Sequence, residues 1–292
     1  MVSVTELHLC YLCPRLLFHH RRQNMGKSGV EHIGSRSGYL QGTILHEILE
    51  EVHTDLSGKG DNELHAALIE ALLSSPDTRE VQFHSLVLNH YVLKKKQKIK
   101  TSGVFPLQDA LRIWEKQLFS CVDRELEHKD TSNKPNIIQI FQSSKQTLIC
   151  DFESKKRLKI RGEPDAVFFD SVEKEYVIWE FKGMKDVHKE RVLMQVALYA
   201  WLLKKTLGIS SRATIFVFEN ENPIWHCDLD EINTKKEEIG KLFEMYCLVL
   251  DAVADGDGST LPHTKDRSVC VQCPISCVSF PLTLSHLSHQ DE

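Results

Sequence analysis

The sequence has no long apolar run. Nowhere does it approach the roughly 20 consecutive apolar residues that a membrane-spanning helix requires. Its first residues, MVSVTELHLCYLCPRLLFHHRR, carry their basic charge after the apolar part, which is the wrong order for a secretory signal peptide. We therefore expect an intracellular, cytoplasmic protein without a membrane partner, or a nuclear or mitochondrial protein if the source is eukaryotic.

Several common enzyme motifs are also missing. The sequence contains no G-x-S-x-G elbow, no Walker A loop and no G-x-G-x-x-G after a strand pattern, which speaks against a small-molecule hydrolase. The net charge of -5 offers no overall attraction for nucleic acid, so any DNA contact must come from a local basic patch. The clearest patch is LKKKQKIK at residues 93–100, although most runs of this kind are solvated surface.

The composition is that of a folded protein. With 292 residues, 41% hydrophobic and 26% charged, the chain has ample material for a core and is unlike disordered, collagenous or coiled-coil sequences. Its nine cysteines lie in a long chain without a secretory signal. This context favours metal or cluster ligation over a disulfide scaffold.

The order of hydrophobic periods predicts an α/β (α+β) fold with a mixed sheet and a helical insertion before that sheet. Residues 1–24 fit one short helix, and helical periodicity dominates from about 40 to 128. From residue 137 the pattern is that of strands, and we expect the first five to form a meander. A helix ending at Gly208, two more strands and a helix from about 231 to 253 follow. The expected strands are NIIQIFQ, TLICDFE, RLKIRG, DAVFFD, YVIWEFK, ATIFVFEN and IWHCDLD.

Three charged residues interrupt these predicted core strands. Alternation along YVIWEFKG places Glu180 and Lys182 on the same face of one strand, and Asp165 begins the adjacent strand of an expected hairpin. Two clustered carboxylates repel unless a cation lies between them, and hard oxygen ligands favour Mg²⁺ or Mn²⁺. An equally weighted alternative is a surface ion pair between Glu180 and Lys182, with Asp165 in a turn.

Such a set suits phosphodiester hydrolysis. A divalent ion lowers the pKa of water and neutralises charge on a scissile phosphate. A neighbouring lysine orients or deprotonates that water and balances the developing negative charge.

Two motifs, G-E-P-D ending at Asp165 and W-E-F-K-G containing Glu180 and Lys182, resemble the active-site motif of the PD-(D/E)xK nuclease superfamily. In QVALYA, Gln195 and Tyr199 are four residues apart on one helix face and are similar to the Q-x-x-x-Y element of the RecB-like branch.

A further motif, GTILHE, contains His46, which matches the upstream histidine of RecB-like nucleases. The alternative is a structural role, which is the more common one for a lone histidine on a helix. The resemblance implies a restriction-endonuclease-like core in which His46, Asp165 and Glu180 bind the metal ion. It also implies that the catalytic residues are Lys182, Asp165, Glu180, Gln195 and Tyr199.

The cysteines at the two ends of the chain extend the resemblance. RecB-like nucleases with a [4Fe-4S] cluster hold it with one cysteine before the nuclease domain and three after it, which implies Cys13, Cys270, Cys273 and Cys277 here. The gap of three residues before Cys277 is shorter than is usual in that family. An alternative is a zinc site in which Cys10 replaces Cys277, giving two C-x-x-C pairs.

The sequence resembles two groups most, the CRISPR-associated Cas-four nucleases and the exonuclease V group. Both imply a metal-dependent exonuclease on single-stranded DNA or DNA ends, with CRISPR integration proteins or DNA-repair proteins as partners. The implied segments are 1–30 with the first cluster cysteine, 31–136 helical with the motif histidine, 137–255 as nuclease core, and 256–292 cysteine-rich. The alternative is a catalytically weak nuclease fold that serves as a DNA-binding or scaffold subunit.

Overall fold

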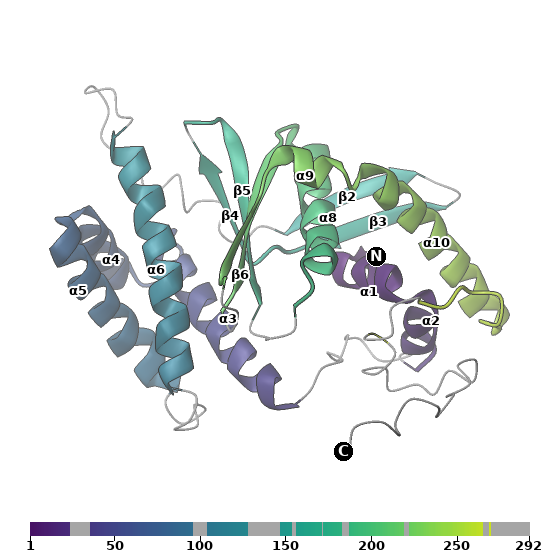
Figure 1. Ribbon diagram of the computed structural model, residues 1–292, viewed down its shortest axis with the longest axis horizontal. Helices are drawn as coiled ribbons and strands as arrows, with labels where there is room; N and C mark the ends of the chain where they lie inside the picture. The colour runs from purple at the N-terminus through teal and green to yellow at the C-terminus, as the bar shows by residue number, and fades with distance from the viewer. Residues whose placement is uncertain are drawn as a thin grey trace, which may run out of the picture.

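Two mixed sheets with helices on their faces form the protein (Figure 1). The structure is a computed structural model that describes residues 1–23, 36–95, 104–127, 147–153, 156–170, 172–182, 187–218, 222–264 and 269. Its mixture of helices and mixed sheets confirms the predicted α/β class. None of the helices in those ranges is both long and apolar enough to cross a membrane.

The described helices and strands follow one another in a single list. They are β1 (Val2–Ser3), α1 (Val4–Leu12), α2 (Pro14–Gln23), α3 (Arg36–Leu56), α4 (Asn62–Leu73), α5 (Pro76–Val87), the π-helical turn η1 (Leu88–Val92), the 3-10 turn η2 (Leu93–Lys95), α6 (Val104–Glu127), β2 (Leu148–Glu153), β3 (Arg157–Gly162), β4 (Ala166–Asp170), β5 (Glu175–Lys182), α8 (Lys189–Leu207), β6 (Ser211–Val217), β7 (Ile224–Cys227), α9 (Leu229–Asn233) and α10 (Lys236–Asp255).

The strands divide into two sheets. In the first, the central β3 is parallel to β1 and antiparallel to β2; the second has the order β4-β5-β6-β7, with β5 parallel to β6 and the other pairs antiparallel. Pairing of β3 ends at Gly162 and pairing of β4 begins at Ala166, with Pro164 between them. The predicted single meander is wrong, because proline has no N–H to continue a ladder and the chain changes sheet here. The predicted strand NIIQIFQ, residues 136–142, lies outside the described residues.

Two predicted helices are each divided in the structure. The helix expected over residues 1–24 is interrupted at Cys13, whose backbone is extended at φ -164° and ψ 110°, because Pro14 disfavours a helical conformation in the residue before it. The helix expected from about 231 to 253 forms as α9 and α10. The predicted end of α8 is confirmed, since Gly208 caps it with a left-handed φ of 75°.

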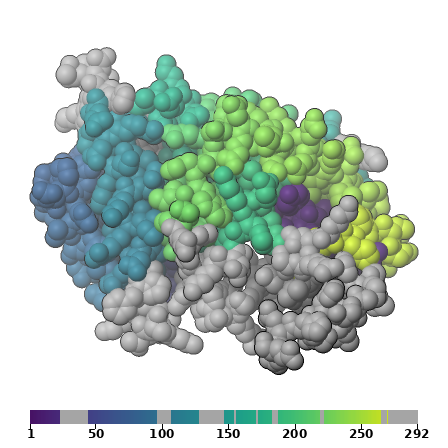
Figure 2. Space-filling model, in the orientation of Figure 1, coloured from purple at the N-terminus to yellow at the C-terminus, as the bar shows by residue number. Residues whose placement is uncertain are grey.

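Two hydrophobic cores cover opposite faces of the second sheet. Trp179 and Phe181 of β5 belong to the core with α3 to α6, whereas Ile178 belongs to the core with α1, α8 and α10. This distribution confirms the predicted alternation along β5. Figure 1 shows α3 to α6 on one side of this sheet and α8 on the other, and Figure 2 shows α4 to α6 forming one end of the molecular surface.

Close packing at Gly162 supports the junction between the sheets and generates a prediction. A Cβ atom added there would lie 2.6 Å from Leu202 Cδ1 and 2.9 Å from Val4 Cγ2, and both side chains are buried. We expect Gly162→Ala to lower the free energy of unfolding by about 1–3 kcal/mol, measured by urea denaturation. The control is Gly240→Ala in α10, where no atom lies within 4 Å of the added Cβ. Equal stability of both variants would contradict this packing account.

Candidate active site

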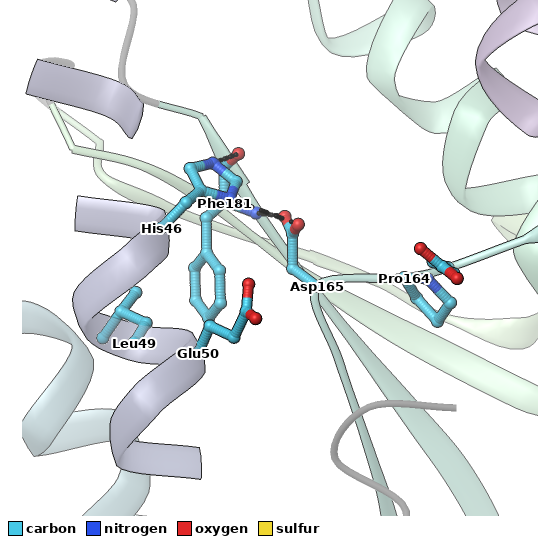
Figure 3. A pocket seen from close by; sticks show the side chains of 7 residues that line it. His46, Leu49, Glu50, Pro164, Asp165 and Phe181 are labelled. Atoms are coloured by element: carbon cyan, nitrogen blue, oxygen red, sulfur yellow. Dashed lines mark hydrogen bonds and ion pairs between the residues drawn. The ribbon is translucent and has the colours of Figure 1, made fainter. Parts of the chain in front are cut away.

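The candidate site lies where the chain passes from one sheet to the other. Asp165 immediately precedes β4, and Glu180 and Lys182 lie at the C-terminal end of β5. Figure 3 shows His46 reaching from α3 toward the backbone of Phe181 and the carboxylate of Asp165. Elements far apart in the sequence thus meet at this edge.

A closed set of contacts joins His46, Asp165 and Phe181. The N–H of Phe181 donates to Asp165 Oδ2 at 2.8 Å, and Asp165 Oδ1 lies 3.2 Å from His46 Nδ1. The second ring nitrogen of His46, Nε2, lies 3.0 Å from the Phe181 carbonyl oxygen. The imidazole therefore faces one carboxylate oxygen and one carbonyl oxygen, an arrangement that favours its protonated form with two N–H donors.

The protonation of this set follows from its charges. Burial lowers the pKa of His46, but the charge and hydrogen bond of Asp165 outweigh burial and raise that pKa above its ordinary value. Burial raises the pKa of Asp165, yet His46, Lys182 and the Phe181 N–H together hold it below the ordinary value. The raised pKa of His46 and the lowered pKa of Asp165 both favour the imidazolium–carboxylate form of this pair.

The second set of contacts lies on the α8 face of β5. Lys182 Nζ donates to Glu180 Oε1 at 2.6 Å and to Gln195 Oε1 at 2.9 Å. Gln195 Nε2 in turn lies 3.4 Å from the hydroxyl oxygen of Tyr199. The side chain of Glu180 is only 3% exposed, and its Oε2 atom has no hydrogen-bond partner among the described residues. Burying a carboxylate oxygen without a hydrogen-bond donor costs free energy of folding, so this oxygen is a candidate to bind a ligand.

Burial and like charge perturb this second set. Burial, followed by the neighbouring charge of Asp165, raises the pKa of Glu180 to about 7 despite Lys182. Burial lowers the pKa of Lys182, but Glu180 and Asp165 outweigh it and raise the pKa above its ordinary value. A carboxyl group poised near neutrality beside a permanent ammonium is characteristic of functional sites.

Two further histidines flank the site and were not singled out by the sequence patterns. Burial and then the charge of Lys182 lower the pKa of His8 to about 3, and burial lowers the pKa of His53 to about 3 against the charge of Asp165. The His53 ring lies in an aromatic cage that includes Phe181, at 6.2 Å between centroids. Both histidines therefore add no positive charge to the site at neutral pH.

A cavity of about 210 Å³ opens beside Asp165. Its wall also includes Glu50 of α3 and Glu163, two acids that the sequence reasoning missed. The signals were present, because Glu50 is four residues from His46 on a helix and Glu163 is two residues from Asp165 along an extended chain. The lining residues are His46, Leu49, Glu50, Glu163, Pro164, Asp165 and Phe181.

The structure thus brings the six residues of the predicted nuclease centre into two adjacent sets, one through His46 and one through Lys182. Within the described ranges, no group of three or more His, Cys, Asp and Glu side chains is arranged to hold a metal ion. Cys13 lies elsewhere, on the α2 side, and Cys270, Cys273 and Cys277 lie outside the described residues.

The donor atoms nevertheless suit a hard divalent cation. Asp165 Oδ1, the unpartnered Glu180 Oε2 and the Phe181 carbonyl are oxygen atoms on adjoining parts of the site. Asp165 and Phe181 line the cavity, which provides access from solvent. These three residues would hold Mg²⁺ or Mn²⁺, joined by His46 once its ring has lost a proton.

Metal binding at these residues should depend on pH. The pKa of His46 is raised and that of Glu180 is raised to about 7, so both groups keep their protons to higher pH than usual, and a bound cation must displace those protons. We expect the affinity for Mn²⁺ to rise between about pH 6 and about pH 8, by about tenfold per unit for each proton displaced. Calorimetric titrations in buffers of different ionisation enthalpy measure both quantities.

The matched control for this prediction is Glu244→Gln, on the exposed face of α10, which should leave the pH dependence unchanged. Glu180→Gln should weaken binding and reduce the number of protons released. A dissociation constant that is the same across this pH range would contradict the assignment.

Comparison with known proteins identifies the family. A profile of the PD-(D/E)XK nuclease superfamily matches residues 1–278, whereas no curated protein matches the chain. Nine chains of solved structures match; one, described as "Crystal structure of SSO0001", shares 16% identity, with a TM-score of 0.32, over 75% of this chain and 94% of that chain. That similarity is too low to support a conclusion. The profile covers nearly the whole sequence, and the chain belongs to the PD-(D/E)XK nuclease superfamily.

Proposed function

We propose that the protein is a RecB-like, metal-dependent exonuclease that hydrolyses single-stranded DNA from its ends. The observation that carries this proposal is the buried Glu180 carboxylate, with one oxygen held by Lys182 and the other without a donor in the described part of the chain. It lies beside Asp165, which lines the cavity, in a chain of a nuclease superfamily whose members typically use Mg²⁺ or Mn²⁺.

Each residue has a role in this proposal. Asp165, Glu180, the Phe181 carbonyl and His46 hold the divalent ion, which when bound neutralises charge on the scissile phosphate. His46 shares its ring between Asp165 and Phe181, so it orients the carboxylate even before it becomes a ligand. The cavity beside Asp165 receives the phosphodiester.

Lys182 acts on the reacting phosphate and water in the proposed mechanism. Two of its three N–H groups are directed to Glu180 and Gln195, which fixes the orientation of the ammonium group. The third has no partner among the described residues, and in the proposal it donates to a phosphate oxygen or orients the attacking water. Gln195 is itself steadied by Tyr199, one turn further along α8. Gln195 and Tyr199 are therefore positioning residues that act through Lys182.

The proposed substrate is a single strand with a free end. The cavity, at about 210 Å³, is small, and α3 and the sheet edge enclose it. This favours one nucleotide-sized group over a duplex. CRISPR integration proteins or DNA-repair proteins are the proposed protein partners, as the resemblance to RecB-like nucleases implies.

Single substitutions test the catalytic assignment. With Mn²⁺ and a labelled linear single strand, we expect Asp165→Asn and Lys182→Met each to lower the cleavage rate at least about 100-fold, because each removes charge stabilisation in the transition state. Glu244→Gln on the remote face of α10 should cleave like the wild type. A circular single strand should resist all of these proteins if a free end is required.

The outcomes separate the alternatives. Cleavage that persists equally in Asp165→Asn and Lys182→Met would come from a contaminant and would refute the assignment. Metal binding and DNA binding without any cleavage would favour the scaffold function over the exonuclease.

We further propose that a [4Fe-4S] cluster joins the two ends of the chain through Cys13, Cys270, Cys273 and Cys277. Cys13 is buried in a small cluster with Leu16 of α2 and Val269, the residue directly before Cys270 in the sequence. The contact supports a shared site because it joins residues 13 and 269 across almost the whole sequence. The three C-terminal cysteines themselves lie outside the described residues.

The approach of the two ends is reinforced by α2. Arg15 donates through Nε to the Leu261 carbonyl at 2.7 Å and through Nη2 to the Ser259 carbonyl at 2.8 Å. Arg22 Nη1 donates to the Gly256 carbonyl at 3.1 Å. The basic residues of α2 thus bind the segment after α10, which directs the chain toward Cys13.

Cys10 discriminates between the cluster and the zinc alternative. It is 1% exposed in the core between α1, α8 and α10, and burial, followed by the charge of Cys13, raises the pKa of its thiol to about 12. Cys13 instead belongs to the separate cluster that contains Val269. This observation favours the cluster, in which Cys10 takes no part.

Cysteine substitutions with metal analysis test the cluster. Anaerobically purified wild type should be brown, with about four iron atoms per chain, and Cys10→Ala should retain that iron. Cys13→Ser and Cys277→Ser should lose both colour and iron. Cys150→Ser, a half-buried thiol of β2, is the control. Zinc that is retained in Cys277→Ser and lost in Cys10→Ala would instead show the two-pair zinc site.

A further inference from the structure

The hairpin of β2 and β3 carries a concentration of positive charge. Residues 155–161, KKRLKIR, contain five basic residues and no acidic one. Along β3 the residues alternate strictly between exposed and buried, with Leu158 and Ile160 in the hydrophobic core. Arg157, Lys159 and Arg161 therefore form a row on the outward face of the strand.

This basic row leads directly to the candidate active site. Arg161 forms an ion pair with Glu163, and Glu163 lines the cavity beside Asp165. Thr147, which precedes β2, also donates to Glu163 at 2.7 Å. The outward face of β3 thus ends at the mouth of the cavity, and Asp165 is four residues beyond Arg161 along the same chain.

Two of the three cations in this row, Arg157 and Lys159, are poorly neutralised by the described residues. Arg157 lies 3.8 Å from Asp151, with side chains that are 73% and 55% exposed, a loose surface pair that contributes little. Lys159 has no ion-pair partner among the residues that the structure describes, although Asp151 is opposite it on β2. By contrast, Lys95, which belongs to the other basic run at residues 93–100, forms ion pairs with Glu47 at 2.9 Å and with Glu51 at 2.7 Å. Arg157 and Lys159 of β3 thus present exposed and weakly paired charge beside the site.

We propose that Arg157, Lys159 and Arg161 form a track for the phosphate backbone of single-stranded DNA as it enters the cavity. The inference rests on the proposed function and names how its substrate is held. Alternate residues of a strand are about 6.8 Å apart, so each cation meets a different phosphate of an extended strand. Such backbone contacts are independent of base sequence and depend strongly on salt.

The track has a direction that fixes the order of its contacts. Arg161 meets the phosphate closest to the cavity, Lys159 the next one outward, and Arg157 the most distant. A short oligonucleotide that occupies the cavity reaches Arg161 but not Arg157. Loss of one cation therefore affects only substrates long enough to touch it.

Salt-dependent binding tests the track. The probe is a fluorescein-labelled oligothymidylate, titrated without divalent ions against the full-length protein at several salt concentrations. Arg157→Gln and Lys159→Gln should each weaken binding and reduce the slope of log affinity against log salt by about 0.7. The matched control is Lys116→Gln, an exposed cation of α6 on the other side of the second sheet, which should change neither quantity.

Substrate length provides a second readout. Cleavage with Mn²⁺ is measured on oligothymidylates of decreasing length. Each variant should raise KM above the wild-type value, with kcat unchanged, only on substrates long enough to reach the substituted residue. As the substrate shortens, this increase should disappear first for Arg157→Gln, then for Lys159→Gln and last for Arg161→Gln. If the wild type cleaves and the three β3 variants match Lys116→Gln in affinity, salt slope and KM, the track alone would be overturned. A wild-type protein that neither binds nor cleaves the oligothymidylates would overturn the track together with the proposed function.

Discussion

The backbone of Phe181 is the constraint on which the site depends. Its N–H binds Asp165 and its carbonyl meets His46, so one residue of β5 ties the junction of the two sheets to α3. Glu180 and Lys182 are its neighbours in the sequence and point to the α8 face. Because the Phe181 side chain is 2% exposed in the helical core, packing on one face of the sheet holds the charged groups on the other.

The charges of the site form a balanced but costly arrangement. The buried Glu180 carboxylate and the partly buried Asp165 carboxylate lie close together, and Lys182 and His46 neutralise one each. Removing either partner would leave an uncompensated charge in a poorly solvated region, which costs more than the pair contributes. An apolar core would stabilise this edge of the sheet at least as well. The arrangement is therefore better explained by the chemistry of a nuclease than by folding stability.

Positive charge is used in two different ways around this centre. Arg15 and Arg22 of α2 donate to backbone carbonyls at residues 256–261 and so hold this part of the chain. The basic residues of β3 instead remain exposed, because their neighbours on the strand fill the core and leave them no buried partner. Segments with similar composition thus differ in role, and the difference arises from which face of each element is covered.

The local pattern of the sequence predicts the α/β class, nearly all of the described strands and the shared face of Glu180 and Lys182, because periods of two and near four residues are local properties of the chain. It also provided the superfamily through short motifs. It did not determine the division into two sheets, the contact of His46 with the Phe181 carbonyl, or the participation of Glu50 and Glu163 in the cavity wall. Those features were decided by tertiary structure, since Pro164 ends one ladder and only long-range packing brings α3 against the edge of the next.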